Sequence, residues 1–189
     1  MMKNNTMMKN YLRLSIALLS TIICVSTWAA APYIPNPATA KMDNAPLVEI
    51  LNAKRTFPGI LSGGQPTDEQ LIQAKNKGYK TIINLRPTSE HQGDKEANKV
   101  RELGMAYINI PVKGASGINS ENSQALIKAL SDSNNYPVMV HCASGNRVGA
   151  LFALDAAQRS QLSTEEAIKV GKQAGLTQLE DVVRNVLEP

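Results

Sequence analysis

The stretch Pro137–Ala157, PVMVHCASGNRVGALFALDAA, decides the fold. It opens with PVMVH, a short apolar run that predicts a buried strand. It closes with Val148–Ala157, an apolar-rich segment that predicts a helix. The residues between them, Cys142–Arg147, must form the turn from strand to helix. Such a turn directs backbone amides and the positive end of the helix dipole to one point, so the sequence predicts an anion-binding loop.

The rest of the chain supplies further strands and helices around this loop. Thr81–Leu85 and Ala106–Ile110 are apolar runs that predict two more buried strands, and Ala53–Ser62, broken by Pro58 and Gly59, predicts an edge hairpin. Helix signals lie at Thr67 with Gln70, at about Gly93–Leu103, after Asn119 or Ser120, at Ser163 with Glu166, and at Thr177 with Glu180. The alternation indicates an α/β fold with a mostly parallel central sheet flanked by helices.

The first 31 residues predict a secretory signal peptide. Lys3, Lys9 and Arg13 precede the apolar run Leu14–Val25, and Ala29–Ala31 provides small residues for cleavage. The apolar run is shorter than the roughly 18 residues that a membrane-spanning helix needs, so cleavage is favoured over retention as an anchor. In a bacterial source, export would place the protein in the periplasm.

Cleavage after Ala31 would remove three basic residues and no acidic residue, lowering the formal net charge from +4 to +1. No basic stripe would remain to bind nucleic acid, and no stable membrane anchor is expected after cleavage. Residues 32–46 carry four prolines and predict an extended linker, and residues 47–189 predict a single domain.

Cleavage would also leave Cys142 alone, because Cys24 belongs to the leader. A lone thiol is unusual in an oxidising compartment, although a free cysteine is often only a small buried apolar residue. Cys142 lies at a predicted helix N-terminus beside Arg147, where cysteine pKa values fall below the ordinary value. Cys142 is therefore the candidate nucleophile, and the Arg147 fork is the candidate group to hold two phosphate oxygens.

Backbone amides of the loop would complete the phosphate cradle, and Gly145 would permit the positive φ that it needs. The candidate amides belong to Ala143, Ser144, Gly145, Asn146 and Arg147. His141 would be buried at the strand end, either orienting the loop by hydrogen bonds or serving as a satisfied core histidine. Arg86 follows a predicted strand and would either bind the anionic substrate or form a surface ion pair.

HCASGNR resembles the phosphate-binding loop of cysteine-dependent tyrosine and dual-specificity phosphatases. Three further segments resemble those of the bacterial beta-lactamase hydrolase-like phosphatase family: GILSGGQPTDEQL, GYKTIINLRPTSE and MAYINIPV. Together with HCASGNR, they extend this resemblance over roughly Lys54–Leu187. The resemblance implies a dual-specificity-phosphatase-like fold. It also implies hydrolysis of phosphate monoesters, of protein or small molecules, through a phosphocysteine at Cys142, with no metal or organic cofactor.

The sequence departs from the better-known phosphatase pattern. Four residues separate Cys142 from Arg147, where that pattern has five, and Val148 stands where a Ser or Thr helps the thiolate to leave. The loop after AYINIPV, KGASGINSEN, contains no Asp to act as general acid.

Three other carboxylates are candidate general acids. Glu121 is nearest in the sequence but suits the first turn of the next helix, and Glu90 and Asp94 suit a solvated surface. General acid catalysis is typically worth about 10² to 10⁴ in rate, so activated aryl phosphates would suffer least from its loss.

Two other functions fit parts of the sequence. The short loop also resembles that of rhodanese-type sulfurtransferases, whose cysteine carries a persulfide, but Asn84 stands where that family has Asp. A phosphate-binding module without turnover would explain the missing acid and the missing hydroxyl. A metalloenzyme is disfavoured because the mature chain offers only His91, His141 and Cys142, without close ligand spacing.

Overall fold

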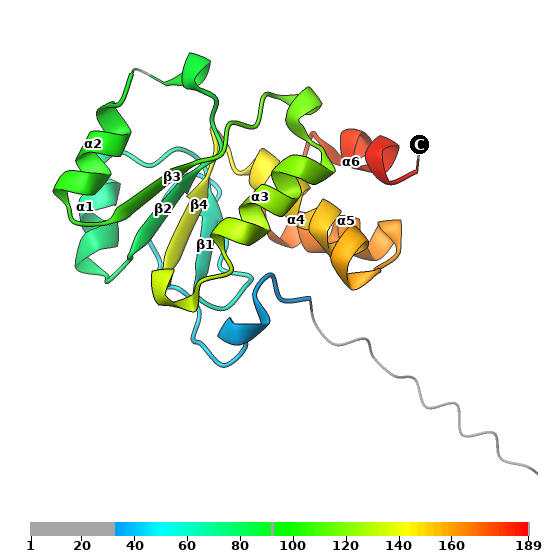
Figure 1. Cartoon of the computed structure of the whole chain (residues 1–189), viewed down its shortest axis with the longest axis horizontal. Coiled ribbons are helices and arrows are strands. Elements are labelled where there is room, and N and C mark those ends of the chain that lie inside the picture. The colour runs from blue at the N-terminus through cyan, green and yellow to red at the C-terminus, as the bar shows by residue number, and fades with distance from the viewer. Residues whose placement is uncertain (1–32, 92, 189) are drawn as a thin grey trace, which may run out of the picture. The chain divides into compact units, whose positions relative to one another are not determined.

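The computed structural model describes residues 33–91 and 93–188 (Figure 1). These residues belong to one compact unit. The signal peptide predicted over residues 1–31 lies outside them. None of the described helices is long and apolar enough to cross a membrane.

A parallel sheet forms the centre of the fold. Its strands are β1 (Ile60–Gly63), β2 (Thr81–Asn84), β3 (Ala106–Asn109) and β4 (Val138–His141). They pair in the order β1-β4-β2-β3, and every pair is parallel. The three strands predicted from apolar runs are confirmed to within one residue at each end. The predicted burial is wrong for β3, which is exposed or half-buried because it lies at the edge of the sheet. Because β4 lies between β1 and β2, three strands end together at the edge where such sheets bind ligands.

Helices cover both faces of this sheet. The α-helices are α1 (Asp68–Asn76), α2 (Lys95–Glu102), α3 (Ser120–Ala129), α4 (Asn146–Ser160), α5 (Thr164–Gln173) and α6 (Glu180–Leu187). Short 3-10 turns span Pro37–Thr39, Thr88–Glu90, Ala115–Gly117 and Ser133–Asn135. Figure 1 shows α1 and α2 on one side of the sheet and the other helices on the opposite side. The alternating side chains of β4 follow this division: Met139 packs in the core with α1 and α2, whereas Val138 and Val140 pack in the core with α3 to α6.

Two of the three predicted capping boxes are present. Thr67 with Gln70 begins α1, and Ser163 with Glu166 begins α5. The prediction for Thr177 with Glu180 is wrong, because α6 begins only at Glu180 and has no side-chain cap. The Thr177 amide instead donates to Oδ1 of Asn146 at 2.9 Å, which ties Thr177 to the start of α4.

The extended linker predicted over residues 32–46 is wrong for its described part, which packs on the domain. Tyr33 Oη donates to Asp155 Oδ2 at 2.5 Å, and Asn36 Nδ2 donates to the Leu130 carbonyl at 2.8 Å. Ala45 is buried in the core. The prolines exclude a long regular element, but they leave these side chains free to fill sites on the folded surface.

The edge hairpin predicted over Ala53–Ser62 is reduced to one antiparallel bridge between Lys54 and Ser62. Ser62 lies in β1, whose regular pairing is parallel, with β4. Pro58 has no amide proton to continue an antiparallel ladder toward the turn, so the strand begins only at Ile60.

Candidate active site

The loop after β4 turns sharply into α4 at Gly145. Gly145 has φ of 91°, a left-handed conformation that favours glycine, and a side chain there would place Cβ 3.3 Å from the Gly63 backbone. α4 therefore starts at Asn146, two residues before the predicted Val148. Asn146 and Arg147 lie in the first turn of α4, where backbone amides have no acceptor within the helix.

Neighbouring segments hold this loop from outside. Asn52 Nδ2 donates to the Ser144 carbonyl at 3.0 Å, and the Gln65 amide donates to the Ala143 carbonyl at 3.3 Å. In a trans peptide the N–H points away from the preceding C=O, so the amides of Ser144 and Gly145 point the other way. The loop therefore presents amides on its inner side, as an anion cradle requires.

Cys142 lies at the centre of this cradle. Its side chain is buried, with 1% of the residue exposed, and it forms no disulfide. The Gly145 amide donates to Sγ of Cys142 at 3.1 Å. An amide aimed at the sulfur at a helix N-terminus is the setting of nucleophilic cysteines.

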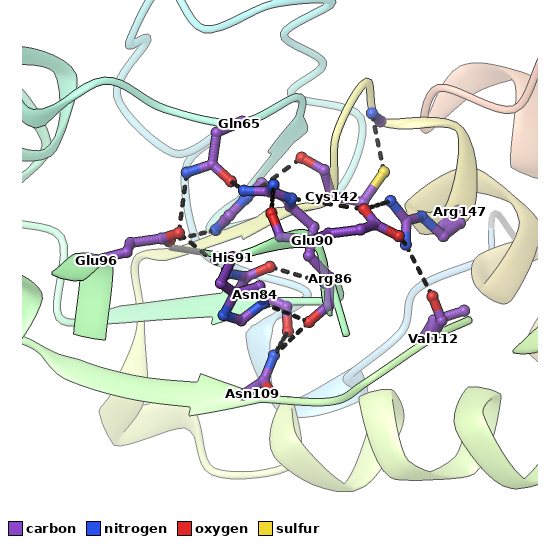
Figure 2. A network of polar contacts seen from close by, with 12 residues as sticks. Gln65, Asn84, Arg86, Glu90, His91, Glu96, Asn109, Val112, Cys142 and Arg147 are labelled. Atoms are coloured by element: carbon purple, nitrogen blue, oxygen red, sulfur yellow. Dashed lines mark hydrogen bonds and ion pairs between the residues drawn. The ribbon is translucent and has the colours of Figure 1, made fainter. Parts of the chain in front are cut away.

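Arg147 reaches over the same loop and is bound by Glu90 (Figure 2). Its Nη1 and Nη2 donate to the two carboxylate oxygens of Glu90 at 2.9 and 2.6 Å, and Nη1 also donates to the Val112 carbonyl at 2.8 Å. Burial lowers the pKa of Arg147, but Glu90 and Cys142 outweigh burial and leave it above its ordinary value. The guanidinium fork therefore carries its charge beside the sulfur.

Glu90 is exposed, as predicted for a solvated surface, but its carboxylate also binds Arg147. The 3-10 turn Thr88–Glu90, which follows β2, carries the carboxylate to Arg147. The hydrogen bond from Arg147 lowers the pKa of Glu90 below its ordinary value, despite some opposing burial. In this arrangement Glu90 is an ion-pair partner and holds no proton to donate.

Arg86 meets the same carboxylate from the other side. Its Nε lies 3.6 Å from Oε2 of Glu90, and its Nη2 donates to the Glu90 carbonyl. Its Nη1 donates to Oε1 of Gln65 at 2.5 Å. Nε is buried and has no hydrogen-bond partner among the described residues. Arg86 and Arg147 thus converge on one carboxylate (Figure 2).

His141 is fully buried and connects the loop to α2. Its Nε2 lies 2.7 Å from Oε1 of Glu96, and its Nδ1 lies 3.3 Å from the Cys142 carbonyl. Oε2 of Glu96 also accepts from Gln65 Nε2 at 2.9 Å and Asn84 Nδ2 at 3.0 Å. Burial raises the pKa of Glu96, but the hydrogen bonds from His141 and Gln65 outweigh it, so the pKa is lowered.

Sequence reasoning did not select Glu96. In the sequence Glu96 is only an acidic residue near the start of a predicted helix. Helices commonly carry acidic side chains there, so this position does not indicate a role in the site. The strand register provides the missing information, because it aligns Asn84 with His141 and with Asn109 at one row of the sheet. Glu96 is hydrogen-bonded to two members of that row, Asn84 and His141.

The remaining predicted residues are placed differently. Glu121 is exposed in the first turn of α3, and Asp94 is exposed at the start of α2. The Asn146 side chain accepts hydrogen bonds from the amides of Thr177 and Leu179, so only its backbone amide is available to the cradle. The described residues contain no group of three or more His, Cys, Asp and Glu side chains that could hold a metal ion.

With this geometry in place, the comparisons with known proteins identify the family. The family model described as "DSP-PTPase phosphatase fused to NAD+ Kinase" matches residues 35–183. The chain belongs to this phosphatase family. Among curated proteins, the chain is 34% identical over 116 residues to the Beta-lactamase hydrolase-like protein of Xylella fastidiosa strain Temecula1, covering 59% of this chain. It is 28% identical over 129 residues to the protein of that name from Agrobacterium fabrum, covering 66% of this chain. The predicted family resemblance is confirmed.

The chain spans only 26% and 30% of the length of these two relatives. Solved structures share its fold at lower sequence identity. A candidate phosphatase (DUF442) from Shewanella putrefaciens CN-32 gives a TM-score of 0.55 at 24% identity, covering 73% of this chain and 92% of that one. TpbA from P. aeruginosa, in complex with pTyr, gives a TM-score of 0.55 at 13% identity, covering 73% and 83%. The predicted α/β phosphatase fold is confirmed.

Proposed function

We propose that this phosphatase hydrolyses phosphate monoesters through a phosphocysteine intermediate at Cys142. The observation that carries the proposal is the convergence of the Gly145 amide and the Arg147 fork around the Cys142 sulfur. A thiol, an amide cradle and a bidentate cation are the groups that phosphoryl transfer to sulfur needs. Membership of a phosphatase family supports the same reaction.

In the proposed reaction the ligand replaces Glu90. The Glu90 carboxylate occupies the Arg147 fork with two oxygens at hydrogen-bond distance, so it stands in for two oxygens of a bound phosphate. The first-turn amides of α4 take the remaining phosphate charge. The phosphorus atom then lies above the Cys142 sulfur, with the ester oxygen directed away from it.

The chemistry proceeds in two displacements. The Cys142 thiolate forms a bond to phosphorus while the bond from phosphorus to the ester oxygen breaks, and the alkoxide or phenoxide that leaves takes a proton from water. Water then attacks the phosphocysteine, releasing inorganic phosphate and the thiolate. Arg147 stabilises the charge that develops on the phosphoryl oxygens in both steps.

Leaving-group basicity should dominate the rate. Glu90 is ionised and paired with Arg147, and Val148, fully buried, offers no hydroxyl to the cradle. Without a positioned acid, esters of acidic phenols should react faster than alkyl esters by up to the 10² to 10⁴ that general acid catalysis is typically worth, an order-of-magnitude figure.

Export forms a second part of the proposal. The predicted leader at residues 1–31 supports secretion to the periplasm of a bacterial source. Fractionation of expressing cells, followed by determination of the mature N-terminus, tests this part. Recovery of the uncleaved chain from the cytoplasm would contradict it.

The catalytic part is tested by turnover of the full chain and its Cys142→Ser variant. Release of p-nitrophenol and phosphate from p-nitrophenyl phosphate should fall to background in the variant, while its far-UV circular dichroism stays unchanged. Thiosulfate with cyanide serves as a second substrate pair. Thiocyanate formation without phosphate release would identify a sulfurtransferase instead, and phosphate binding without any turnover would identify a binding module.

A further inference from the structure

One carboxylate bridges two guanidinium groups at the mouth of the candidate active site. Glu90 accepts from both terminal nitrogens of Arg147, and its Oε2 also faces Nε of Arg86 at 3.6 Å. The Glu90 side chain is 35% exposed, whereas that of Arg147 is 9% exposed. The partly exposed carboxylate is therefore the movable member of the cluster, and the arginines are its fixed members.

Gln65 also holds Arg86 in place. Gln65 accepts from Arg86 Nη1 through its side-chain oxygen and donates through its side-chain nitrogen to Glu96. Glu96 in turn binds His141, which directly precedes the candidate nucleophile. Arg86 therefore belongs to the same hydrogen-bonded assembly as the phosphate loop.

Departure of the Glu90 carboxylate would leave Arg86 without a charged partner. Arg86 would lose the carboxylate that faces Nε at 3.6 Å, while Nη2 would keep its main-chain acceptor, the Glu90 carbonyl. Nε is already buried without a hydrogen bond among the described residues. The Arg86 side chain is 20% exposed, and its buried Nε and its charge would favour a replacement anion, because unpaired buried donors and charges are costly.

A cavity of about 330 Å³ opens beside Arg86. Basic residues in its lining are Arg86, His91 and Lys95, and no Phe, Tyr or Trp contributes to it. Its acidic members are Asp68, Glu90 and Glu96. Asp68 lies 3.9 Å from Lys95, and Glu96 is hydrogen-bonded to three donors. Displacement of the Glu90 carboxylate would leave Arg86 as the cation without a charged partner in this lining, so the space would then suit a polar, anionic group better than an aromatic ring.

We propose that Arg86 determines specificity by binding a second anionic group of the substrate, a phosphate or a carboxylate, while Arg147 binds the phosphate that is transferred. Glu90 holds both arginines when no ligand is bound. This inference rests on the proposed function, since it assigns the phosphate that reacts to Arg147. The substrate class expected from two such arginines is a compact phosphate ester with a neighbouring anionic group.

The test measures binding to the full chain carrying Cys142→Ser, with orthophosphate and pyrophosphate as probes at one ionic strength. Pyrophosphate should bind about tenfold more tightly than orthophosphate, the effect of roughly one additional charge-assisted hydrogen bond. Adding Arg86→Gln should collapse this preference to less than about twofold. Adding Arg86→Lys should restore part of it, because lysine keeps the charge without the planar fork.

Arg101→Gln is the matched control. Arg101 is an exposed arginine on α2, and its replacement removes the same charge without touching the cluster. The pyrophosphate preference should survive this change. Equal weakening of both probes by Arg86→Gln would overturn the inference, since Arg86 would then contact the transferred phosphate itself. The inference would also be overturned if the chain carrying Cys142→Ser alone bound pyrophosphate no more tightly than orthophosphate.

Failure of this inference is distinguishable from failure of the proposed function. The binding comparison requires no turnover. The proposed function fails if the natural chain releases no phosphate from p-nitrophenyl phosphate, or if Cys142→Ser, in an otherwise unchanged chain, still hydrolyses it.

Discussion

Glu96→Ala would remove the carboxylate that ties together the ends of three strands. Its oxygens hold His141 at the end of β4, Asn84 at the end of β2 and Gln65 just after β1. His141 is fully buried and the Glu96 side chain is 15% exposed. The substitution would therefore leave three buried or half-buried donors without their acceptor, at the edge of the sheet that carries the phosphate loop.

The expected cost follows from the burial of these groups. Leaving a buried donor without its acceptor costs about 1 to 3 kcal/mol. Because the Glu96 side chain is 15% exposed, water can reach part of the vacated space, which favours the lower end, about 1 kcal/mol for each of the three donors and about 3 kcal/mol together. For a chain of this size, each kcal/mol lowers the melting temperature by about 2 to 4 °C, which predicts a fall of roughly 6 to 12 °C.

Urea unfolding near neutral pH, followed by far-UV circular dichroism, measures this cost. Glu102→Ala is the control, because Glu102 ends the same helix but is exposed, and surface substitutions usually change stability by less than about 0.5 kcal/mol. A cost for Glu96→Ala no larger than that of the control would refute the assigned role.

The pH dependence provides a second check on Glu96. Its pKa in the folded protein is lowered from the ordinary 4.5, since hydrogen bonds outweigh burial. A lowered carboxyl pKa contributes stability that is fully present above the unfolded value and is lost as the pH falls through the folded value. The difference between the natural protein and Glu96→Ala should therefore be constant near neutral pH and shrink below 4.5. A difference that stays the same through that range would contradict the lowered pKa.

Three further substitutions test other contacts. Glu90→Gln should tighten orthophosphate inhibition roughly fivefold by removing a partly exposed competing charge worth up to about 1 kcal/mol, and weaker inhibition would mean that Glu90 assists the ligand. Gly149→Ala would place Cβ 2.1 Å from the Leu176 amide nitrogen, so α4 should shift at a cost of at least about 1 to 3 kcal/mol; an unchanged melting temperature would contradict this close packing. Tyr33→Phe should cost about 1 kcal/mol by removing the hydrogen bond to Asp155, and no change in urea unfolding would argue that the segment before β1 is not docked.

Local signals in the sequence were sufficient to predict most of the fold. The strand, turn and helix around Cys142 could be predicted because each depends on residues close together in the chain. The capping boxes at Thr67 and Ser163 were likewise readable. Thr177 shows the limit of such patterns, because a distant side chain, that of Asn146, binds its amide and the cap does not form.

Contacts between distant parts of the chain escaped prediction. Glu90 and Arg147 are 57 residues apart, and Glu96 and His141 are 45 apart, so no local pattern links either pair. Both contacts depend on the strand order, which places β4 beside β2. Their glutamates follow β2 in the chain, in segments that by composition alone suit a solvated surface.

The most direct test of the central claim is trapping the covalent intermediate. The full chain is mixed with p-nitrophenyl phosphate, quenched in acid within the first turnover, digested and sequenced by mass spectrometry. We predict one phosphoryl group on Cys142, accompanied by a burst of p-nitrophenol, because no hydroxyl at Val148 assists hydrolysis of the intermediate. Steady phosphate release with no phosphoryl group on Cys142, and with activity retained in Cys142→Ser, would contradict the account.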